Sequence, residues 1–284
     1  MKKQILLYLL FTVILLSSSK FMSMHPSSAK IIFLYRMTSR PDSTSKATWT
    51  ELTQLAISDS ISEFRSIARY KADSLINKYQ HTELNSPLFH EGMNEMDNLP
   101  RYKFDGIVIK NFKYNTCTYF GTIGKVISYY QEKDYPMKWR ISSDTTTING
   151  YRCQRAYTSL GGRDYAVWFT RQLPFSNGPY KFGGLPGLII QAVDKTNSYR
   201  FELTHMYKPA KEYAIRMPQE VMTLAKTTVN VSKNKYYTSY FDYKNNFIEN
   251  ITNNGMVQIN NMEAFKKNHL EKLKKRNNPI ELKY

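Results

Sequence analysis

The residue types that most often do chemistry are few and scattered in this chain of 284 residues. The histidines are isolated from one another, at His25, His81, His90, His205 and His269. No Gly-x-Ser-x-Gly segment and no His-Glu-x-x-His segment occurs, so the commonest serine hydrolase and zinc protease signatures are absent. Because a catalytic triad is defined in space rather than by sequence order, a hydrolase with an unrecognised site remains an alternative. We therefore assign no catalytic residue.

Two glycines, Gly178 and Gly183, have the spacing of a phosphate-binding loop. That loop continues with a lysine, which reaches the phosphates, and with a serine or threonine, which binds magnesium. Gly184 and Leu185 occupy those two positions here, so the side chains that nucleotide binding needs are missing.

A set of soft ligands, His90, Met93 and Met96, recurs at intervals of three residues. Imidazole and thioether ligands suit monovalent copper, but methionine is also ordinary core filler. We assign no metal and no cofactor to the chain.

The first residues have the order of a secretory signal peptide. Lys2 and Lys3 precede an apolar run from Ile5 to Leu16, and three small serines follow it. A membrane-spanning helix needs about 20 apolar residues, which is more than this run offers. We predict that residues 1–19 are a cleaved signal and that residues 20–284 form a single exported domain.

Export changes how the two cysteines and the charge are interpreted. Cys117 and Cys153 could persist as a disulfide worth about 3–4 kcal/mol, or they could be two separate buried thiols.

The chain has 40 Lys and Arg against 23 Asp and Glu, a formal net charge of +17. Outside the cytoplasm the abundant polyanions are lipid headgroups, lipopolysaccharide and acidic glycans, so we expect no nucleic acid partner. The alternative is a solvated basic surface, since the charge forms no block.

The elements that must position these residues are mostly strands, because side chains alternate between apolar and polar along much of the chain. Asn149-Gly150 and Gly161-Gly162 are two-residue turn signals that suit tight hairpins. We predict a mainly β fold, an antiparallel meander forming a curved sheet or half-barrel. The predicted strands are Ile31 to Met37, Trp49 to Ile57, Ile107 to Phe112, Thr116 to Thr122, Val126 to Tyr130, Arg140 to Ile148, Tyr151 to Tyr157, Tyr165 to Thr170, Leu188 to Val193 and Tyr199 to Met206.

One C-terminal helix is predicted over about 261–276, which leaves an α+β class open. Asn260 is its expected cap, with Glu263 three residues on, as in a capping box. Its apolar stripe either docks on the sheet or lies on a membrane surface. Residues 60–79 fit either a helix or a loop.

The sharpest local feature is the segment from Gly178 to Ile190. Pro186 presets φ and Gly187 supplies positive φ, so we predict a type II turn and a rigid corner before a buried strand. We assign ligand or partner contact to the residues near this corner and to one aromatic residue of the preceding strand, namely Tyr180, Lys181, Phe182, Leu185 and Trp168.

The corner carries a resemblance to a known family. Its run Gly184, Leu185, Pro186, Gly187, Leu188, Ile189 is the motif after which the GLPGLI family (Porph_ging type) of exported Bacteroidota proteins is named. The chain is similar to that family mainly from Trp139 to Asp194, and again near Asn278-Pro279. Residues 225–255 have no counterpart and are interpreted as an insertion.

The resemblance implies an exported protein of unassigned activity, whose genes neighbour TonB-dependent outer-membrane transporters. We expect a non-enzymatic binding or carrier module in the periplasm, on the outer-membrane surface or in the medium. Its ligand would be a lipid or another anionic envelope component. The alternative is an interaction component of an outer-membrane transport assembly.

Overall fold

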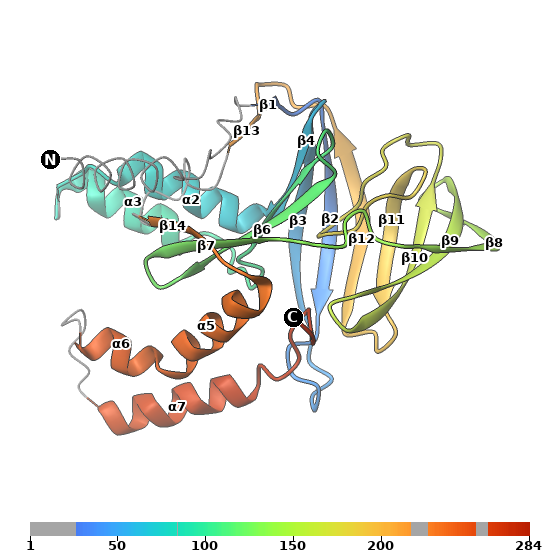
Figure 1. The fold of residues 1–284 in the computed structure, drawn as a ribbon. Coiled ribbons are helices and arrows are strands. Elements are labelled where there is room, and N and C mark those ends of the chain that lie inside the picture. The colour runs from blue at the N-terminus through green and yellow to red at the C-terminus, as the bar shows by residue number, and fades with distance from the viewer. Residues whose placement is uncertain (1–26, 84, 217–226, 254–260) are drawn as a thin grey trace, which may run out of the picture.

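The structure, a computed structural model, describes residues 27–83, 85–216, 227–253 and 261–284 (Figure 1). The predicted signal peptide and the predicted cap Asn260 lie outside the described residues. The strands are β1 (Ser27–Ser28), β2 (Ile31–Ser39), β3 (Trp49–Ile57), β4 (Ile61–Ser66), β5 (Ile107–Asn111), β6 (Thr116–Ile123), β7 (Val126–Gln131), β8 (Arg140–Ile148), β9 (Tyr151–Leu160), β10 (Arg163–Thr170), β11 (Leu188–Asp194), β12 (Tyr199–Tyr207), β13 (Ala214–Ile215) and β14 (Thr227–Asn230). The helices are α2 (Ile67–Tyr79), α3 (Pro87–Asp97), α5 (Lys233–Asn245), α6 (Phe247–Asn253) and α7 (Met262–Lys274).

Twelve of the strands form one open sheet in the order β14-β7-β6-β5-β4-β3-β2-β12-β11-β10-β9-β8. All of its pairings are antiparallel except β14 with β7. Two successive meanders, β2 to β7 and β8 to β12, meet where β12 pairs with β2. The predicted mainly β, antiparallel fold is therefore confirmed.

The two predicted hairpin turns are confirmed in detail. Asn149, Gly150, Gly161 and Gly162 all have positive φ, as the tight two-residue turns require. Each turn joins directly paired strand residues, Ile148 with Tyr151 and Leu160 with Arg163.

The prediction of a single helix was wrong, because the described residues contain four more. Residues 60–79 divide into β4 and α2, and the change occurs at Ser66, whose hydroxyl accepts from Arg69 N. Ser86 caps α3 and Ser232 caps α5 in the same way. The cap of α7 is Asn261, one residue after the predicted one. The stretch interpreted as an insertion supplies β14, α5 and α6.

The two faces of the sheet are buried differently. Phe33, Tyr35 and Met37 of β2 point into the main core, on what we call the core face. Ile32 points to the other, outer face, where a smaller apolar cluster packs beside β1 and β13. The members of that smaller cluster come from β2 to β7 and from the segments around Ala29 and Ile215.

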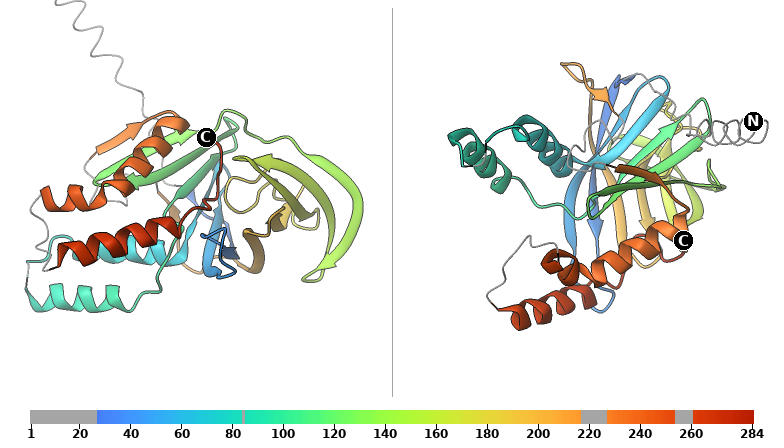
Figure 2. Two further views of the ribbon diagram at one scale, coloured as in Figure 1. Left: turned by 90° about the horizontal axis from the view of Figure 1, so that it is seen from below. Right: turned by 60° about the vertical axis from the view of Figure 1, so that its left-hand side comes forward.

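The outer face of β8 to β12 therefore lies beyond this cluster. The described helices lie on the side of the molecule away from β8 to β11 (Figures 1 and 2), where α5 packs against β6 and β7 and α2 packs against β3 and β4. Among the described residues, no helix is long and apolar enough to span a membrane.

Candidate functional site

A row of five side chains crosses the outer face at one level, from β9 to β2. Direct pairing aligns Arg155 with Trp168, Trp168 with Gln191, Gln191 with Glu202 and Glu202 with Arg36. Directly opposite residues in antiparallel strands lie on the same face, so the row is continuous. We call it the first row.

A second row runs beside it, two residues along each strand. It joins Arg140 of β8, Tyr157, Ala166, Val193 and Arg200 by the same kind of pairing. Its middle members are the smallest, and its ends carry guanidinium groups. The second row is therefore low at the centre and cationic at both ends.

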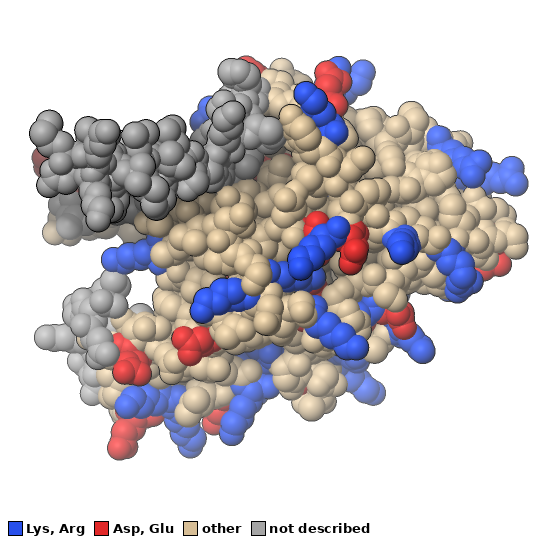
Figure 3. Space-filling view, viewed as in Figure 1, with Lys and Arg blue, Asp and Glu red and all other residues tan. Residues whose placement is uncertain are grey.

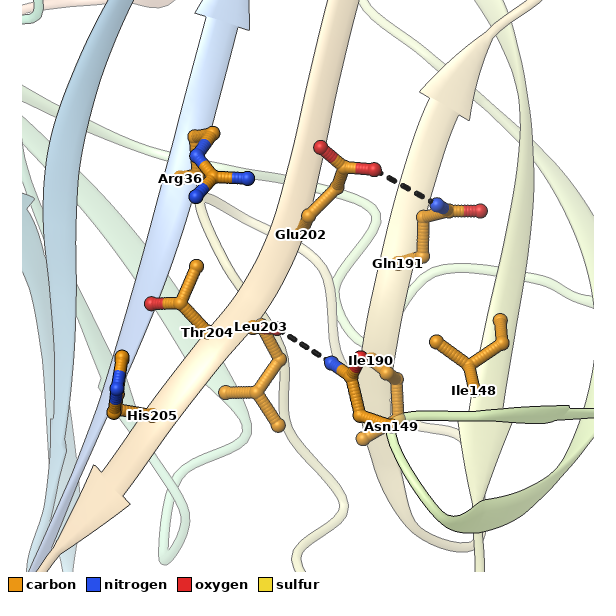
Figure 4. Close-up of a pocket in the computed structure, with 9 residues that line it drawn as sticks. All are labelled: Arg36, Ile148, Asn149, Ile190, Gln191, Glu202, Leu203, Thr204 and His205. Carbon is orange, nitrogen blue, oxygen red and sulfur yellow. Dashed lines mark hydrogen bonds between the residues drawn. The ribbon is translucent and has the colours of Figure 1, made fainter.

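The two rows line a hollow. A cavity of about 1100 Å³ contacts every member of the second row, together with Arg155, Trp168 and Gln191 of the first. A smaller cavity of about 310 Å³ adjoins it at Gln191 and includes Glu202 and Arg36 (Figure 4). The turn between β8 and β9 extends over this end, where Asn149 Nδ2 donates to Leu203 O at 2.8 Å.

Cations and aromatic rings are stacked along the hollow. The Arg140 guanidinium lies 4.3 Å from the Tyr157 ring centroid. The Arg155 guanidinium lies 5.1 Å from Tyr157 and 5.5 Å from Trp168. Its nearest carboxylate, Asp144, is 3.9 Å away, and its buried Nε has no hydrogen-bond partner in the described protein. Arg155 thus has donor capacity that its neighbours do not use.

The acidic side chains of the hollow are fixed by protein partners, although a carboxylate that accepts one or two bonds keeps further acceptor sites. Asp164 accepts from Ser159 Oγ at 2.5 Å, and Asp194 pairs with Arg163 at 3.0 Å. The backbone amides of residues 198 and 199 also donate to Asp194. The remaining charge on the lining comes from Lys138, Arg140, Arg155, Lys195 and Arg200.

The residues predicted to contact a ligand or partner are divided between the two faces. Trp168 lies in the hollow, in the first row. Tyr180, Lys181 and Phe182 are 0% exposed and Leu185 is 1% exposed, all packed on the core face. Only Trp168 among these five therefore lines the hollow.

Lys181 belongs to a buried polar cluster with the C-terminal segment. Its ammonium donates to Glu281, Glu132 and the Tyr130 hydroxyl, and Tyr180 also donates to Glu281. Lys233 lies 2.6 Å from the second oxygen of Glu281. Burial opposes the charge of Glu281, but Lys181 and Lys233 outweigh it and hold the pKa of that carboxyl below its usual value.

A second buried lysine fixes the loop that contains the corner. Lys110 Nζ donates to Asn177 Oδ1, Gly178 O and Phe182 O at 2.6–2.8 Å. Burial lowers the pKa of Lys110 to about 7. The three oxygens need an ammonium, because a neutral amine has only two N–H donors.

The corner itself differs from the predicted type II turn. Gly187 does have positive φ, at 152°, but its N–H donates to Leu185 O across Pro186 at 2.8 Å. This bond spans three residues and defines a γ-turn. Leu188 N instead bonds to Leu173 O at 3.0 Å, which turns the chain straight into β11.

The structure holds Cys117 and Cys153 as two separate buried thiols, the alternative to the disulfide. Burial raises the pKa of Cys117 to about 12, so its thiol is not reactive at neutral pH. His90, Met93 and Met96 lie in α3. In the part of the chain that the structure describes, no group of three His, Cys, Asp or Glu side chains could hold a metal ion.

The fold and the hollow define an open-sheet protein with a cation-lined hollow on one face. The model of a family described as "Protein of unknown function (Porph_ging)" matches residues 162–191, from β10 through the corner into β11. The match is confined to this short segment, and over that segment it confirms the resemblance stated above.

Two solved structures are similar to the chain, "Structure of PNGF-II in P21 space group" and "Structure of PNGF-II in C2 space group". Both are 15% identical, with TM-scores of 0.48 and 0.49 respectively. The similarity covers 77% of this chain and 34% of theirs, so the chain spans about a third of the length of those proteins. No curated protein matches the chain.

Sequence reasoning found one member of the two rows, Trp168, and missed the others. The missed residues occupy alternating positions of strands that were predicted, so their common face could have been assigned. Their alignment across five strands could not, because it depends on register and on the crossover that places β12 beside β2.

Proposed function

We propose that the chain is a non-enzymatic binding or carrier module of the cell envelope, which holds an anionic ligand in the hollow of β8 to β12. The observation that carries this proposal is the cavity of about 1100 Å³, lined by five cations and the rings of Tyr157 and Trp168. Its volume reaches the upper end of ordinary small-ligand sites, about 300–1,000 Å³. The predicted export gives such a site access to envelope polyanions.

Binding is better supported than hydrolysis, because each acidic group of the hollow is held by a protein partner rather than directed at an open position. A hydrolase needs acid, base or nucleophile side chains that converge on an open position. Asp164 and Asp194 have protein partners, and Glu202 accepts from Gln191 at 3.1 Å and lies 3.3 Å from Arg200. The lining is arranged to hold charge.

The alternative of docking to a transport assembly through the Gly-Pro corner has less support. The corner residue Leu185 and its neighbours Tyr180 and Phe182 are buried in the core. A partner could reach them only if the loop left its place.

The proposal is tested by titrating residues 20–284 with lipopolysaccharide, anionic phospholipid vesicles and acidic glycans in a calorimeter. We expect at least one of them to bind, and Arg155→Gln to weaken that binding about 10-fold or more, which corresponds to about 1.4 kcal/mol. Lys272→Gln in α7 is the matched control, since it removes one exposed charge far from the hollow in the sequence. If the two variants bind every polyanion equally well, the hollow is not the site.

A further inference from the structure

The chemistry of the two rows narrows the ligand class. We infer that the hollow takes a carboxylated oligosaccharide, a chain of sugar rings that carry uronic acid groups. This inference rests on the proposed function and goes further, because it names what the anion must be. It follows from three properties of the lining, which are its rings, its unused guanidinium donors and its acceptors.

The rings provide platforms for sugar faces. Tyr157 and Trp168 stand in adjacent rows, with the small residues Ala166 and Val193 next to them on the floor. A sugar ring presents an apolar C–H face that packs on an aromatic ring, while its polar edge stays accessible to hydrogen bonds. The low floor leaves room for such a ring beside the aromatic groups.

The guanidinium groups are placed to bind a carboxylate. Arg155 lies over the rings of Tyr157 and Trp168, and its nearest carboxylate among the described residues, Asp144, is 3.9 Å from Nη1. A planar guanidinium fixed by stacking presents a pair of N–H donors that match the two oxygens of a carboxylate. Arg140 adds a second stacked guanidinium at one end of the second row, whereas Arg200 at the other end already donates to Glu202 and Asn197.

Acceptors stand among these cations, and they decide between classes of anion. Glu202 lies in the first row between Gln191 and Arg36, and Asp164 lies in the lining of the same hollow. A polyphosphate carries negative charge on every unit and has no hydroxyl groups along its chain, so it would be repelled wherever it lay beside these carboxylates. A uronic acid chain carries one carboxylate per ring and can turn the hydroxyl edge of the ring toward them. Sugar hydroxyls can donate to the remaining acceptor sites of Glu202 and Asp164, so a ligand with both hydroxyl and carboxylate groups matches the acceptors as well as the cations of the lining.

The shape of the site argues against a lipid. The aliphatic lining of the larger cavity is confined to Ala166 and Val193, and its other apolar surface belongs to the rings of Trp139, Tyr157, Tyr165 and Trp168. Flat rings set among cations match the faces of sugar rings better than a flexible acyl chain. The first row instead crosses four inter-strand spacings, about 19 Å. This length suits several linked sugar rings lying across the strands.

The test is calorimetric titration of residues 20–284 with oligogalacturonate, using its methyl ester, inorganic polyphosphate and phosphatidylglycerol vesicles as comparisons. We expect oligogalacturonate to bind and the ester to bind at least 10-fold more weakly. Trp168→Leu and Arg155→Gln should each weaken binding about 10-fold, and Lys272→Gln should leave it unchanged. Arg155→Lys, which keeps the charge but loses the planar donors, should also weaken it.

The outcomes distinguish a wrong ligand class from a wrong binding site. If polyphosphate or vesicles bind in an Arg155-dependent way and oligogalacturonate does not, the ligand class is wrong and the binding function stands. If no ligand responds to Arg155→Gln or Trp168→Leu, both proposals fail. Thermal melting of each variant checks that it is folded. If Trp168→Leu is unfolded, the binding measured with Arg155→Gln alone tests both proposals.

Discussion

Lys181 and Glu281 form an ion pair in which both side chains are 0% exposed. Taking two charges out of water is costly, and the cost is met here by several further bonds from Tyr130, Tyr180, Glu132 and Lys233. The pair therefore fixes the arrangement of its surroundings more than it adds stability. Removing one partner, however, leaves the other as an uncompensated buried charge.

We expect Lys181→Met to lower the free energy of unfolding by about 3–5 kcal/mol, measured by urea denaturation. Adding Glu281→Gln to that variant should restore part of the loss, because the orphaned carboxylate is removed. Lys78→Met is the control, since Lys78 lies 3.1 Å from Glu95 in an exposed pair and should hardly change the midpoint. Equal effects of the two single variants would refute this account of the buried pair.

The same cluster predicts how stability depends on acid. The pKa of Glu281 is lower in the folded protein than in the unfolded chain, so the unfolded state binds the proton more tightly. Its contribution to stability is complete above the unfolded pKa of about 4.3 and is lost as the pH falls through the folded value. Urea denaturation between pH 7 and pH 3 should therefore show a steeper acid loss for the natural chain than for Glu281→Gln. Parallel curves would contradict the prediction.

Neither residue of this pair could be matched from the sequence. Lys181 was assigned to ligand contact because it lies in an aromatic segment near the corner, but its partner is 100 positions away. Sequence patterns indicate local periodicity, and they do not indicate which buried acidic side chain pairs with which buried basic one. The same limit applies to the rows of the hollow, where Trp168 was found and Arg155 and Glu202 were not.

Gly187, at the corner, and Gly150, in the β8–β9 turn, differ in how strictly the structure requires glycine. Gly187 has φ 152°, and a Cβ there would overlap the Thr170 carbonyl. Gly150, in the β8–β9 turn, also has positive φ, but a Cβ added there would meet nothing within 4 Å. The first glycine is required by packing as well as by backbone conformation.

Gly150→Ala should therefore cost about 1 kcal/mol, the strain of a left-handed alanine. Gly187→Ala should cost at least about 3 kcal/mol, because the backbone of β10 or β11 must also move. Thermal or urea denaturation of the two variants measures the difference. A Gly187→Ala variant as stable as Gly150→Ala would show that the corner is not tightly packed.

Most strands could be predicted, while most helices could not. The hairpins of β8 to β12 have clear alternation and turn residues with positive φ, which is local information. The α2 helix follows β4 directly, with polar and apolar residues in an irregular pattern, and only the Ser66 cap separates them. The γ-turn at Gly187 depends on Leu188 bonding to Leu173, a contact between segments that the sequence does not align.

The molecule carries its positive charge over a broad surface. Figure 3 shows Lys and Arg distributed over the visible face, with Asp and Glu among them. Such a distribution draws anions toward the protein without choosing where they bind. In the function proposed above, the hollow makes that choice, because its stacked guanidinium groups and rings lie in two rows.

The C-terminal segment connects parts of the fold that are distant in sequence. Asn278 bonds to the backbone of residues 40 and 41 in the β2–β3 turn. Arg163 donates to Pro279 O, and the amides of residues 282 and 283 donate to Gly161 O in the β9–β10 turn. Glu281 meets Lys181 of the corner loop and Lys233 of α5. Four separate elements are thus held by one short segment.

Deleting residues 278–284 should therefore destabilise the whole molecule rather than loosen one end. The deletion leaves Lys181 buried without Glu281 and frees Arg163 from its carbonyl partners, a loss of about 5 kcal/mol or more. That is comparable to the total stability of an ordinary domain, so the shortened chain should be unfolded or melt far below the natural one. Deleting Tyr284 alone, whose ring stacks on Tyr237 at 4.0 Å, is the control and should cost about 1 kcal/mol. Circular dichroism melts of both would decide, and a 278–284 deletion that melts like the Tyr284 deletion would show that the two meanders hold together without this segment.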